Sequence, residues 1–130
     1  MIGGVDSSNK AIKFCEKYDV FDHKWKAMPQ MNHERASAGA LITSDKRFLY
    51  AFQGLARNTE NAFYNVPSIE RIDLLNGHQE WVLIEVERHE QFKNRSCCAM
   101  IQNEDDILIF GGFNWESGQV LSDIQVLNCD

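Results

Sequence analysis

Five features recur in the same order along this 130-residue chain. They are an arginine, an apolar run, a pair that ends in glycine, a pair that ends in Asp or Asn, and a tryptophan. Successive copies lie 50 to 60 residues apart, and chance does not supply such an ordered set. The matching positions are Arg35 and Arg95; Gly3-Gly4, Gln53-Gly54 and Gly111-Gly112; Tyr18-Asp19, Ile72-Asp73 and Leu127-Asn128; and Trp25 and Trp81. A period of this size predicts an architecture built from one repeated structural unit.

Short runs of β-branched and aromatic residues fill the chain, and few stretches have the spacing of an amphipathic helix. The continuous apolar runs at 48–52 and 107–110 predict strands that are buried on both faces. Asn76-Gly77 lies between two predicted strands, 68–73 and 81–86, and predicts a hairpin. The segment 85–93 could form two helical turns, but it is polar, and we interpret it as a loop. The predicted strands are 12–18, 24–27, 36–43, 48–52, 68–73, 81–86, 97–102, 106–110 and 123–127.

Charge and composition narrow the function classes. The 13 Lys+Arg and 19 Asp+Glu residues give a net charge of −6, which argues against a nucleic-acid partner. Apolar runs such as 48–52 have only five residues, whereas a membrane helix needs about 20, so we expect no membrane partner and no secretory signal. The cysteines Cys15, Cys97, Cys98 and Cys129 lack zinc-site spacing and are predicted to be buried free thiols. Free thiols are typical of a cytoplasmic protein.

The ordered features, with Trp25 followed by Met28-Pro29 and Met31, resemble the kelch repeat over nearly the whole chain, from Ile2 to Asn128. The most specific piece is the third copy, 106–112 with 121–124. The resemblance implies an all-β, partial kelch-type β-propeller of about 10 antiparallel strands in about two and a half blades. It places a partial blade without its first strand at 1–31, a complete blade with a long inter-strand loop at 32–93, and a partial blade without its last strand at 94–130. Because propellers have about 4 to 8 blades, we expect a fragment whose remaining blades come from a longer chain or another subunit.

The resemblance also implies that the repeated residues are structural. A glycine pair ends a strand where a side chain would obstruct packing, the aromatic residues pack between blades, and the arginine bonds carbonyls or carboxylates. The set is Gly3, Gly4, Tyr18, Trp25, Arg35, Gly54, Trp81, Arg95, Gly111 and Gly112. The middle copy departs from the pattern at Gln53 and Ile72 and carries a long insert at 55–67. We expect these departures to weaken the packing contacts of that copy.

The function implied by the resemblance is a non-catalytic protein–protein interaction module of an adaptor or scaffold. In kelch propellers the loops on one face usually hold the partner, and here the corresponding loops are 6–11, 55–67 and 113–120. Aromatic residues and arginine are the types enriched at interface hot spots. The candidate partner-binding residues are Arg57, Phe63, Tyr64, Asn114, Trp115 and Glu116. The alternatives for the loop 55–67 are that Phe63 and Tyr64 fold back onto the blade, or that the loop is an inert insertion.

A second hypothesis is a fragment of an enzyme built on a kelch-type propeller, either oxidase or isomerase-like, since the family includes a copper oxidase. No metalloprotease, serine-hydrolase or phosphate-loop motif is present, however, and His33 and His89 each precede a glutamate without a second histidine at the required spacing. We therefore predict no catalytic, metal or cofactor residues. Family members act as substrate receptors of ubiquitin ligases or as cytoskeletal adaptors, and the sequence does not separate these roles.

Overall fold

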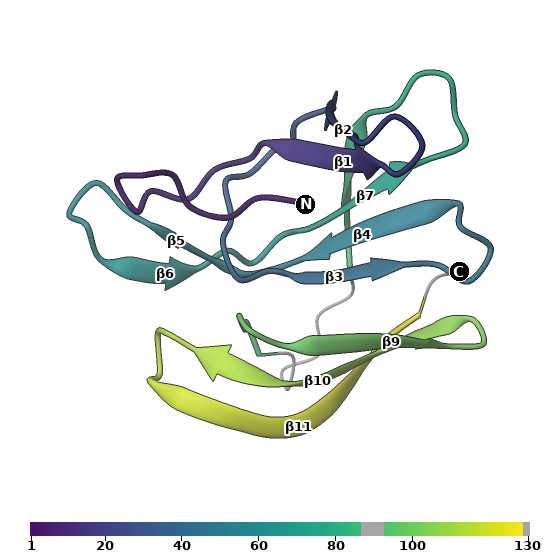
Figure 1. Ribbon diagram of the computed structural model, residues 1–130. Helices are drawn as coiled ribbons and strands as arrows, with labels where there is room; N and C mark the ends of the chain where they lie inside the picture. The colour runs from purple at the N-terminus through teal and green to yellow at the C-terminus, as the bar shows by residue number, and fades with distance from the viewer. Residues whose placement is uncertain (87–92, 129–130) are drawn as a thin grey trace.

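The computed structural model describes residues 1–86 and 93–128, and every regular element in that part of the chain is a β-strand (Figure 1). These residues form no helix that could cross a membrane. All strand pairs are antiparallel, so the prediction of an all-β chain is confirmed. The strands are β1 (Cys15–Asp19), β2 (Lys24–Met28), β3 (Gly39–Ile42), β4 (Phe48–Phe52), β5 (Leu55–Arg57), β6 (Phe63–Asn65), β7 (Ile69–Asp73), β8 (Trp81–Ile84), β9 (Ala99–Asn103), β10 (Asp106–Asn114) and β11 (Gln119–Asn128).

The middle sheet has four strands in the order β3-β4-β7-β8, with the β5–β6 hairpin inserted in the chain between β4 and β7. Tyr50, Ala51 and Phe52 of β4 are each at most 2% exposed. Because successive side chains of a strand point to opposite faces, this part of β4 is buried on both faces, as predicted. Tyr50 and Phe52 pack in the core shared with β10 and β11, whereas Ala51 packs in the core shared with β1.

The third sheet has the order β11-β10-β9 and buries one face against the middle sheet. Ile107 and Ile109 of β10 are fully buried in that contact. Leu108 and Phe110 point to the opposite face and are only half-buried. Burial on both faces is therefore the wrong prediction for 107–110, because no sheet among the described residues covers the second face.

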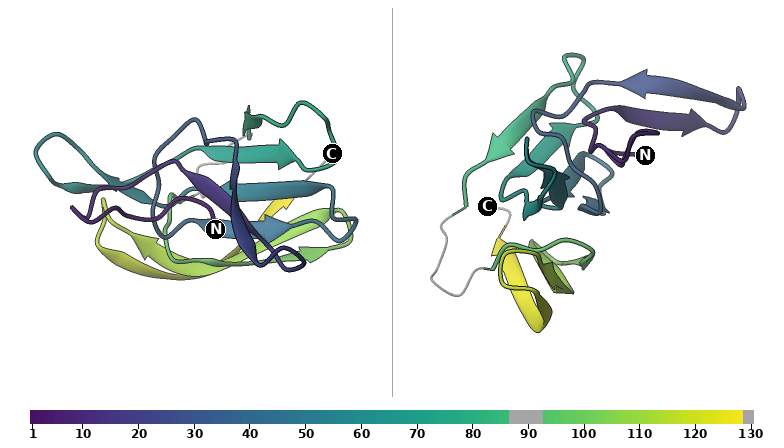
Figure 2. Two further views of the ribbon diagram at one scale, coloured as in Figure 1. Left: turned by 45° about the horizontal axis from the view of Figure 1, so that its top comes forward. Right: turned by 90° about the vertical axis from the view of Figure 1, so that its left-hand side faces the viewer.

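The three sheets are stacked in chain order, with β1–β2 on one side of the middle sheet and β9–β11 on the other (Figures 1 and 2). Cys15, Met31 and Ile72 belong to the core between the first two sheets. Phe52 and Ile69 meet Ile107, Ile109 and Leu127 in the core between the second and third. A smaller apolar cluster anchors the β5–β6 hairpin and consists of Ala11, Ala36, Leu55, Ala56 and Val66.

The insert at 55–67 was predicted to be a long loop. It instead contains the β5–β6 hairpin. The side chain of Asn58 closes its turn by accepting hydrogen bonds from the backbone N–H groups of Glu60 and Ala62. The expected second strand of the first copy is reduced to an isolated bridge between Ile2 and Cys15. These two differences give eleven strands in the described residues instead of about ten.

The structure also tests the predictions made for the cysteines and for the hairpin at Asn76-Gly77. Cys97 has a φ of 55° and donates its N–H to Ser37, so β9 begins only at Ala99. Its thiol is exposed, and the prediction of a buried thiol is wrong there, whereas Cys15 is buried. Asn76-Gly77 lies in the turn between the paired strands β7 and β8, as predicted. Most of the predicted loop 85–93 and Cys129 lie outside the described residues.

Candidate partner-binding site

Three pairs of residues have nearly the same unusual backbone conformation. The φ angles are 56° and 114° at Gly3-Gly4, 47° and 111° at Gln53-Gly54, and 58° and 110° at Gly111-Gly112. The first member lies in the left-handed region, which a residue with a side chain can adopt at a moderate energetic penalty. The second member lies beyond it, where glycine is strongly favoured. This accounts for Gln53 at a first position and glycine at every second position.

The glycine at the second position of a pair also permits a close approach of one backbone segment to another. A Cβ atom on Gly54 would lie 2.7 Å from the carbonyl oxygen of Ala36, and one on Gly112 would lie 2.7 Å from that of Ser96. After Gln53-Gly54 the chain leaves β4 and enters the β5–β6 hairpin, with Leu55 bridged to Ala36. At Gly111-Gly112, β10 continues across a bulge and stays paired with β11, while Phe113 also bridges to Ser96. The β5–β6 hairpin directly follows Gln53-Gly54, and the end of β10 and the β10–β11 turn follow Gly111-Gly112. These two segments contain the predicted partner-binding residues.

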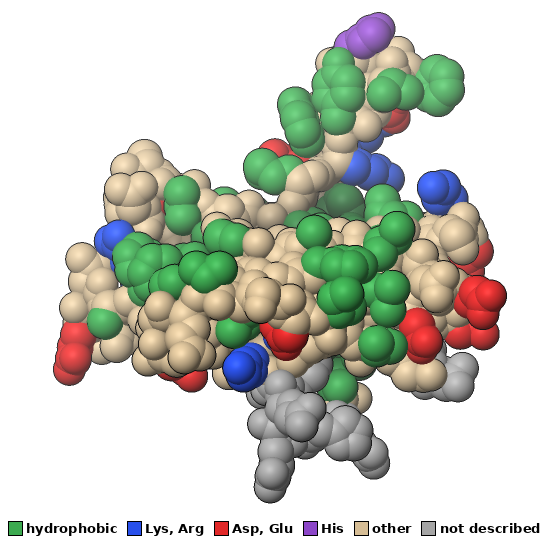
Figure 3. Space-filling model, turned by 90° about the horizontal axis from the view of Figure 1, so that it is seen from below, with side chains coloured by type: hydrophobic (Ala, Val, Ile, Leu, Met, Phe, Trp, Pro, Cys, Tyr) green, Lys and Arg blue, Asp and Glu red, His purple; other side chains and the backbone are tan. Residues whose placement is uncertain are grey.

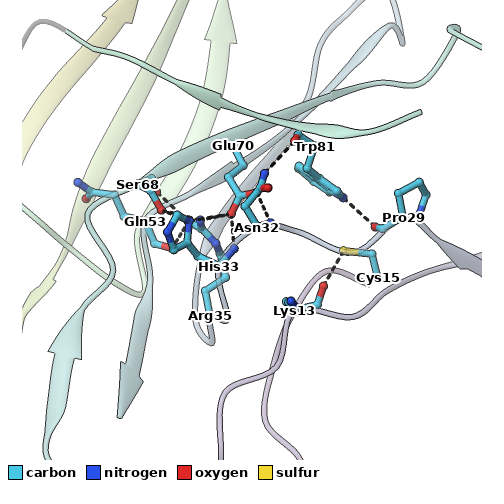
Figure 4. A network of polar contacts seen from close by, with 10 residues as sticks. All are labelled: Lys13, Cys15, Pro29, Asn32, His33, Arg35, Gln53, Ser68, Glu70 and Trp81. Atoms are coloured by element: carbon cyan, nitrogen blue, oxygen red, sulfur yellow. Dashed lines mark hydrogen bonds and ion pairs between the residues drawn. The ribbon is translucent and has the colours of Figure 1, made fainter. Parts of the chain in front are cut away.

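Arg35 is fully buried and anchors the turn at the Gln53-Gly54 pair (Figure 4). Its Nη1 donates to the carbonyl oxygens of Gln53 and Ser68 at 2.8 and 2.7 Å. Its Nη2 donates to Oε1 of Glu70 at 2.6 Å, and both charged side chains are fully buried. A buried arginine of this kind satisfies carbonyls that would otherwise lack donors, while the carboxylate compensates its charge.

Glu70 is held as a carboxylate by its hydrogen bonds. Burial alone would raise the pKa of Glu70, but hydrogen bonds from the backbone N–H groups of Asn32 and His33 and from the side chains of Asn32 and Arg35 outweigh it. The pKa of Glu70 is therefore lowered from its usual 4.5. Through these bonds, Glu70 ties the segment that leaves the first sheet to the middle sheet (Figure 4).

Arg95 repeats this arrangement in the third sheet. It is fully buried, and its Nη1 donates to the carbonyl oxygen of Gly111 at 2.9 Å, the counterpart of the bond from Arg35 to Gln53. Its guanidinium also donates to both carboxylate oxygens of Asp123, at 3.2 and 2.9 Å. The hydrogen bond from Arg95 lowers the pKa of Asp123. Both arginines thus fix the backbone at the first residue of one of these pairs, Gln53 or Gly111.

The two tryptophans of the repeated pattern have different surroundings. Trp81 is 5% exposed, packs with Cys15 and Met31 under the first sheet, and donates its Nε1–H to the carbonyl oxygen of Pro29 at 2.9 Å. Trp25 is 59% exposed and contacts Tyr18, which lies opposite it on β1, with the ring centroids 5.4 Å apart. Trp81 is covered by the preceding sheet, and no described residues form such a sheet in front of Trp25.

All three predicted loop segments lie at the same end of the stack, at the left of Figure 1. The β5–β6 hairpin and the β10–β11 turn are joined there by the side chain of Asn65, which is 2% exposed. Its Oδ1 accepts a hydrogen bond from the backbone N–H of Trp115 at 2.7 Å, and its Nδ2 donates to the carbonyl oxygen of Phe113 at 3.5 Å. Two segments some 50 residues apart in the sequence therefore form one surface.

Arg57, Phe63, Phe113 and Trp115 form an aromatic cluster on that surface. The ring centroid of Trp115 lies 4.7 Å from that of Phe63 and 4.9 Å from that of Phe113. The guanidinium of Arg57 lies 4.3 Å above the centroid of Phe63. Phe63 is 40% and Trp115 38% exposed, although both have fixed neighbours. The side chains of the cluster are thus held in place by one another and are still partly exposed to solvent.

Comparison with known protein families and with curated proteins finds no match for this chain. Within residues 1–86 and 93–128, no three His, Cys, Asp or Glu side chains are grouped so that they could hold a metal ion.

The remaining predicted residues are distributed around the aromatic cluster. Tyr64 is 40% exposed and lines a separate cleft of about 360 Å³ together with Lys13, His33 and Pro67. Glu116 is exposed in the β10–β11 turn. Asn114 is 9% exposed, and its side chain holds that turn by donating to the carbonyl oxygen of Asn94 and accepting from the N–H of Ser117.

Sequence reasoning missed Asn65 and Phe113 as parts of this surface. Phe113 directly follows the Gly111-Gly112 pair and was included only as the start of a loop. Asn65 lies in a segment with no regular alternation of apolar residues, and its role depends on a contact with the third sheet. A second cleft of about 590 Å³, lined mainly by apolar residues that include Ile2, Met28, Leu41 and Leu49, contains none of the predicted binding residues.

Proposed function

We propose that this chain is a non-catalytic protein–protein interaction module, built as part of a kelch-type β-propeller, and that it binds its partner through the aromatic cluster and through Tyr64, the next residue on β6, which lines a separate cleft. The cluster consists of arginine and aromatic side chains, the types that contribute most binding energy at protein interfaces. It lies on turns and a hairpin that a rigid framework positions, which is the usual location of binding residues.

The propeller part of the proposal is supported by contacts that repeat from sheet to sheet. The N–H of Gly4 donates to the carbonyl oxygen of Arg35, and the N–H of Gly54 donates to that of Arg95. Gly4 and Gly54 therefore each bond the arginine of the following repeat by the same atoms. This relation agrees with repeated units that each contact their neighbours in sequence.

The observation that carries the binding proposal is that Trp115 and Phe63 are fixed and yet more than a third exposed. Trp115 is positioned by a hydrogen bond from its backbone N–H to Asn65 and by one from its Nε1–H to Oγ of Ser96, at 3.2 Å. Side chains that are already ordered lose little conformational entropy when a partner covers them. The surface is thus prepared for an apolar or aromatic side chain of a partner protein.

The experiment selects a partner peptide and then tests the site. A random peptide library displayed on phage is panned against the immobilised chain, and the affinity of the enriched peptides is measured by calorimetry. We expect Trp115→Ala to weaken binding by a factor of about 10 or more, as for a hot-spot residue. Tyr64→Ala should weaken it as well, with thermal unfolding of both variants close to that of the unaltered chain.

The matched control is Trp25→Ala, which removes another exposed tryptophan from a different part of the molecule. It should leave the affinity unchanged. Peptides that bind both Trp115→Ala and Tyr64→Ala as tightly as the unaltered chain would show that binding occurs elsewhere.

A further inference from the structure

The third sheet presents an apolar face to solvent. Pairing across β9, β10 and β11 places Ile101, Leu108 and Val126 in one row on that face, and Phe110 beside Ile124 in the next. Ile101, Ile124 and Val126 are each more than half exposed. Figure 3 looks onto this side of the molecule and shows hydrophobic side chains gathered across it. We call this surface the third-sheet face.

The third-sheet face is equivalent to a face that the middle sheet buries. Leu49 pairs with Ile72 as Ile107 pairs with Leu127, which aligns β4 and β7 with β10 and β11. In this alignment Tyr50 and Phe52 correspond to Leu108 and Phe110, and Ile69 corresponds to Ile124. Tyr50, Phe52 and Ile69 are at most 2% exposed because the third sheet covers them. The third-sheet face therefore has the pattern of a surface that a following β-sheet covers.

The opposite end of the stack presents the matching half of such a contact. Tyr18 and Trp25 lie opposite each other on β1 and β2, on the face directed away from the buried Cys15. Their counterparts in the middle sheet, Ile72 and Trp81, are buried because a preceding sheet covers them. We call the surface formed by Tyr18 and Trp25 the first-sheet face. Each end of the molecule thus carries one half of the contact that joins its own sheets.

Charge favours contact between the two ends. Residues 1–31 contain five lysines and four acidic residues, a net charge of +1. Residues 94–130 contain one arginine and six acidic residues, a net charge of −5. Association that brings unlike ends together is therefore attractive, whereas two copies that met through their third-sheet faces would bring two strongly acidic segments together.

We propose that a second copy of this chain docks head to tail, with the third-sheet face of one copy against the first-sheet face of the next. The contact is heterologous, so it leaves one free face at each end and allows further copies to add. It uses neither Trp115 nor Tyr64 and is independent of the partner proposed for the aromatic cluster. The association reproduces between chains the sheet-to-sheet packing that exists within one chain.

Sedimentation velocity of the purified chain tests this directly. The unaltered chain should sediment faster as its concentration is raised. Ile124→Asp, which alters only the third-sheet face, and Trp25→Asp, which alters only the first-sheet face, should each be monomeric alone. An equimolar mixture of the two variants should form a dimer and nothing larger, because one intact face of each kind remains. The exposed Leu75, in the turn after β7, provides the control Leu75→Asp, which should associate like the unaltered chain.

Val126→Asp and Tyr18→Asp form a second pair of variants, and circular dichroism verifies that each variant is folded. An unaltered chain that stays monomeric at every concentration overturns the proposal, as does a mixture of the two variants that remains monomeric while the unaltered chain associates. If association were lost only in the variants of one face, the contact would be a symmetric one between two copies of that face, and this result would also overturn the proposal. Trp115 and Tyr64, the two residues tested for peptide binding, belong to neither face, so the outcome for them does not depend on this experiment.

Discussion

The side chain of Gln53 joins the middle sheet to the third sheet at Arg95. Its Oε1 accepts a hydrogen bond from the backbone N–H of Arg95 at 2.9 Å, and its Nε2 donates to Oδ1 of Asn94 at 3.1 Å. Gln53 replaces the first glycine of the repeated pair, and we expected this departure to weaken packing. That expectation concerned packing within the middle copy. The fully buried side chain of Gln53 instead adds contacts between the middle and third sheets.

We predict that Gln53→Gly lowers the free energy of unfolding by about 1–3 kcal/mol, because it leaves the buried N–H of Arg95 without its acceptor. The free energy of unfolding of the Gln53→Ala variant should be lower still, because alanine has a side chain and yet must adopt the strained φ of 47°. Urea denaturation of the two variants measures the difference. A Gln53→Gly chain more stable than the unaltered one would show that backbone strain outweighs the bridge.

Gly54→Ala should be strongly destabilising, because the φ of 111° is unfavourable for alanine and its Cβ would lie 2.7 Å from the carbonyl oxygen of Ala36. Strain of this kind amounts to about 1–3 kcal/mol before the collision is counted. Gly4→Ala separates the two effects, since its φ is 114° but no atom lies within 4 Å of the added Cβ. Gly77→Ala has neither problem and is the control. Thermal unfolding should rank the variants as Gly54→Ala, Gly4→Ala and Gly77→Ala, from least to most stable.

Arg35→Met should lower the free energy of unfolding by about 3–5 kcal/mol, because it leaves the carboxylate of Glu70 buried without its cation. The control is Arg47→Ala, which removes an ion pair with Asp73 in which the arginine is half exposed. Such a surface pair contributes about 0–1 kcal/mol. Similar losses for the two variants in guanidinium denaturation would contradict the anchoring role assigned to Arg35.

The lowered pKa of Glu70 predicts a dependence of stability on pH. A carboxyl whose pKa is lower in the folded chain than in the unfolded chain stabilises the fold above its unfolded value, here close to 4.5. That contribution is lost as the pH falls through the folded pKa. The free energy of unfolding should therefore decrease as the pH is lowered below about 4.5, and Glu70→Gln should show a smaller decrease over the same range. Parallel curves for the two chains would assign the acid sensitivity to other carboxyls.

Cys97 should be the first of the described cysteines to react with iodoacetamide. Its thiol is exposed, whereas burial raises the pKa of the Cys15 and Cys98 thiols and reduces their thiolate fraction. Mass spectrometry of a Cys129→Ser chain after short labelling should find the modification at Cys97, and at Cys15 and Cys98 only after denaturation. Equal labelling of Cys15 in the folded chain would contradict its burial.

Local pattern sufficed to predict the class of the fold and most of its strands. Runs such as 48–52 and 106–110 have apolar, β-branched or aromatic side chains bounded by turn residues, and the structure contains β4 and β10 at these positions. The hairpin at 55–65 was missed because β5 and β6 have three residues each, too few for a period to show. Its pairing depends on the turn closed by Asn58 and on the backbone conformation at Gln53-Gly54.

The candidate site was predicted only as separate segments. Sequence identified Phe63 and Trp115 by residue type, but their contact depends on how the middle and third sheets pack. The same limit applies to Trp25 and Trp81, which occupy equivalent positions in the sequence pattern. Their exposed fractions differ because a neighbouring sheet covers only one of them, and such coverage is a property of the tertiary structure.

The buried amide of Asn65 separates the framework of the proposed partner-binding surface from its exposed side chains. Asn65 holds the hairpin against the β10–β11 turn through hydrogen bonds to the backbone of Trp115 and Phe113. The rings, the tip of the hairpin and Glu116 can therefore be exchanged while the framework is retained. Under the proposed function, substitutions at those positions change partner choice with little effect on folding, whereas Asn65 and the two buried arginines have to be retained for the framework to form.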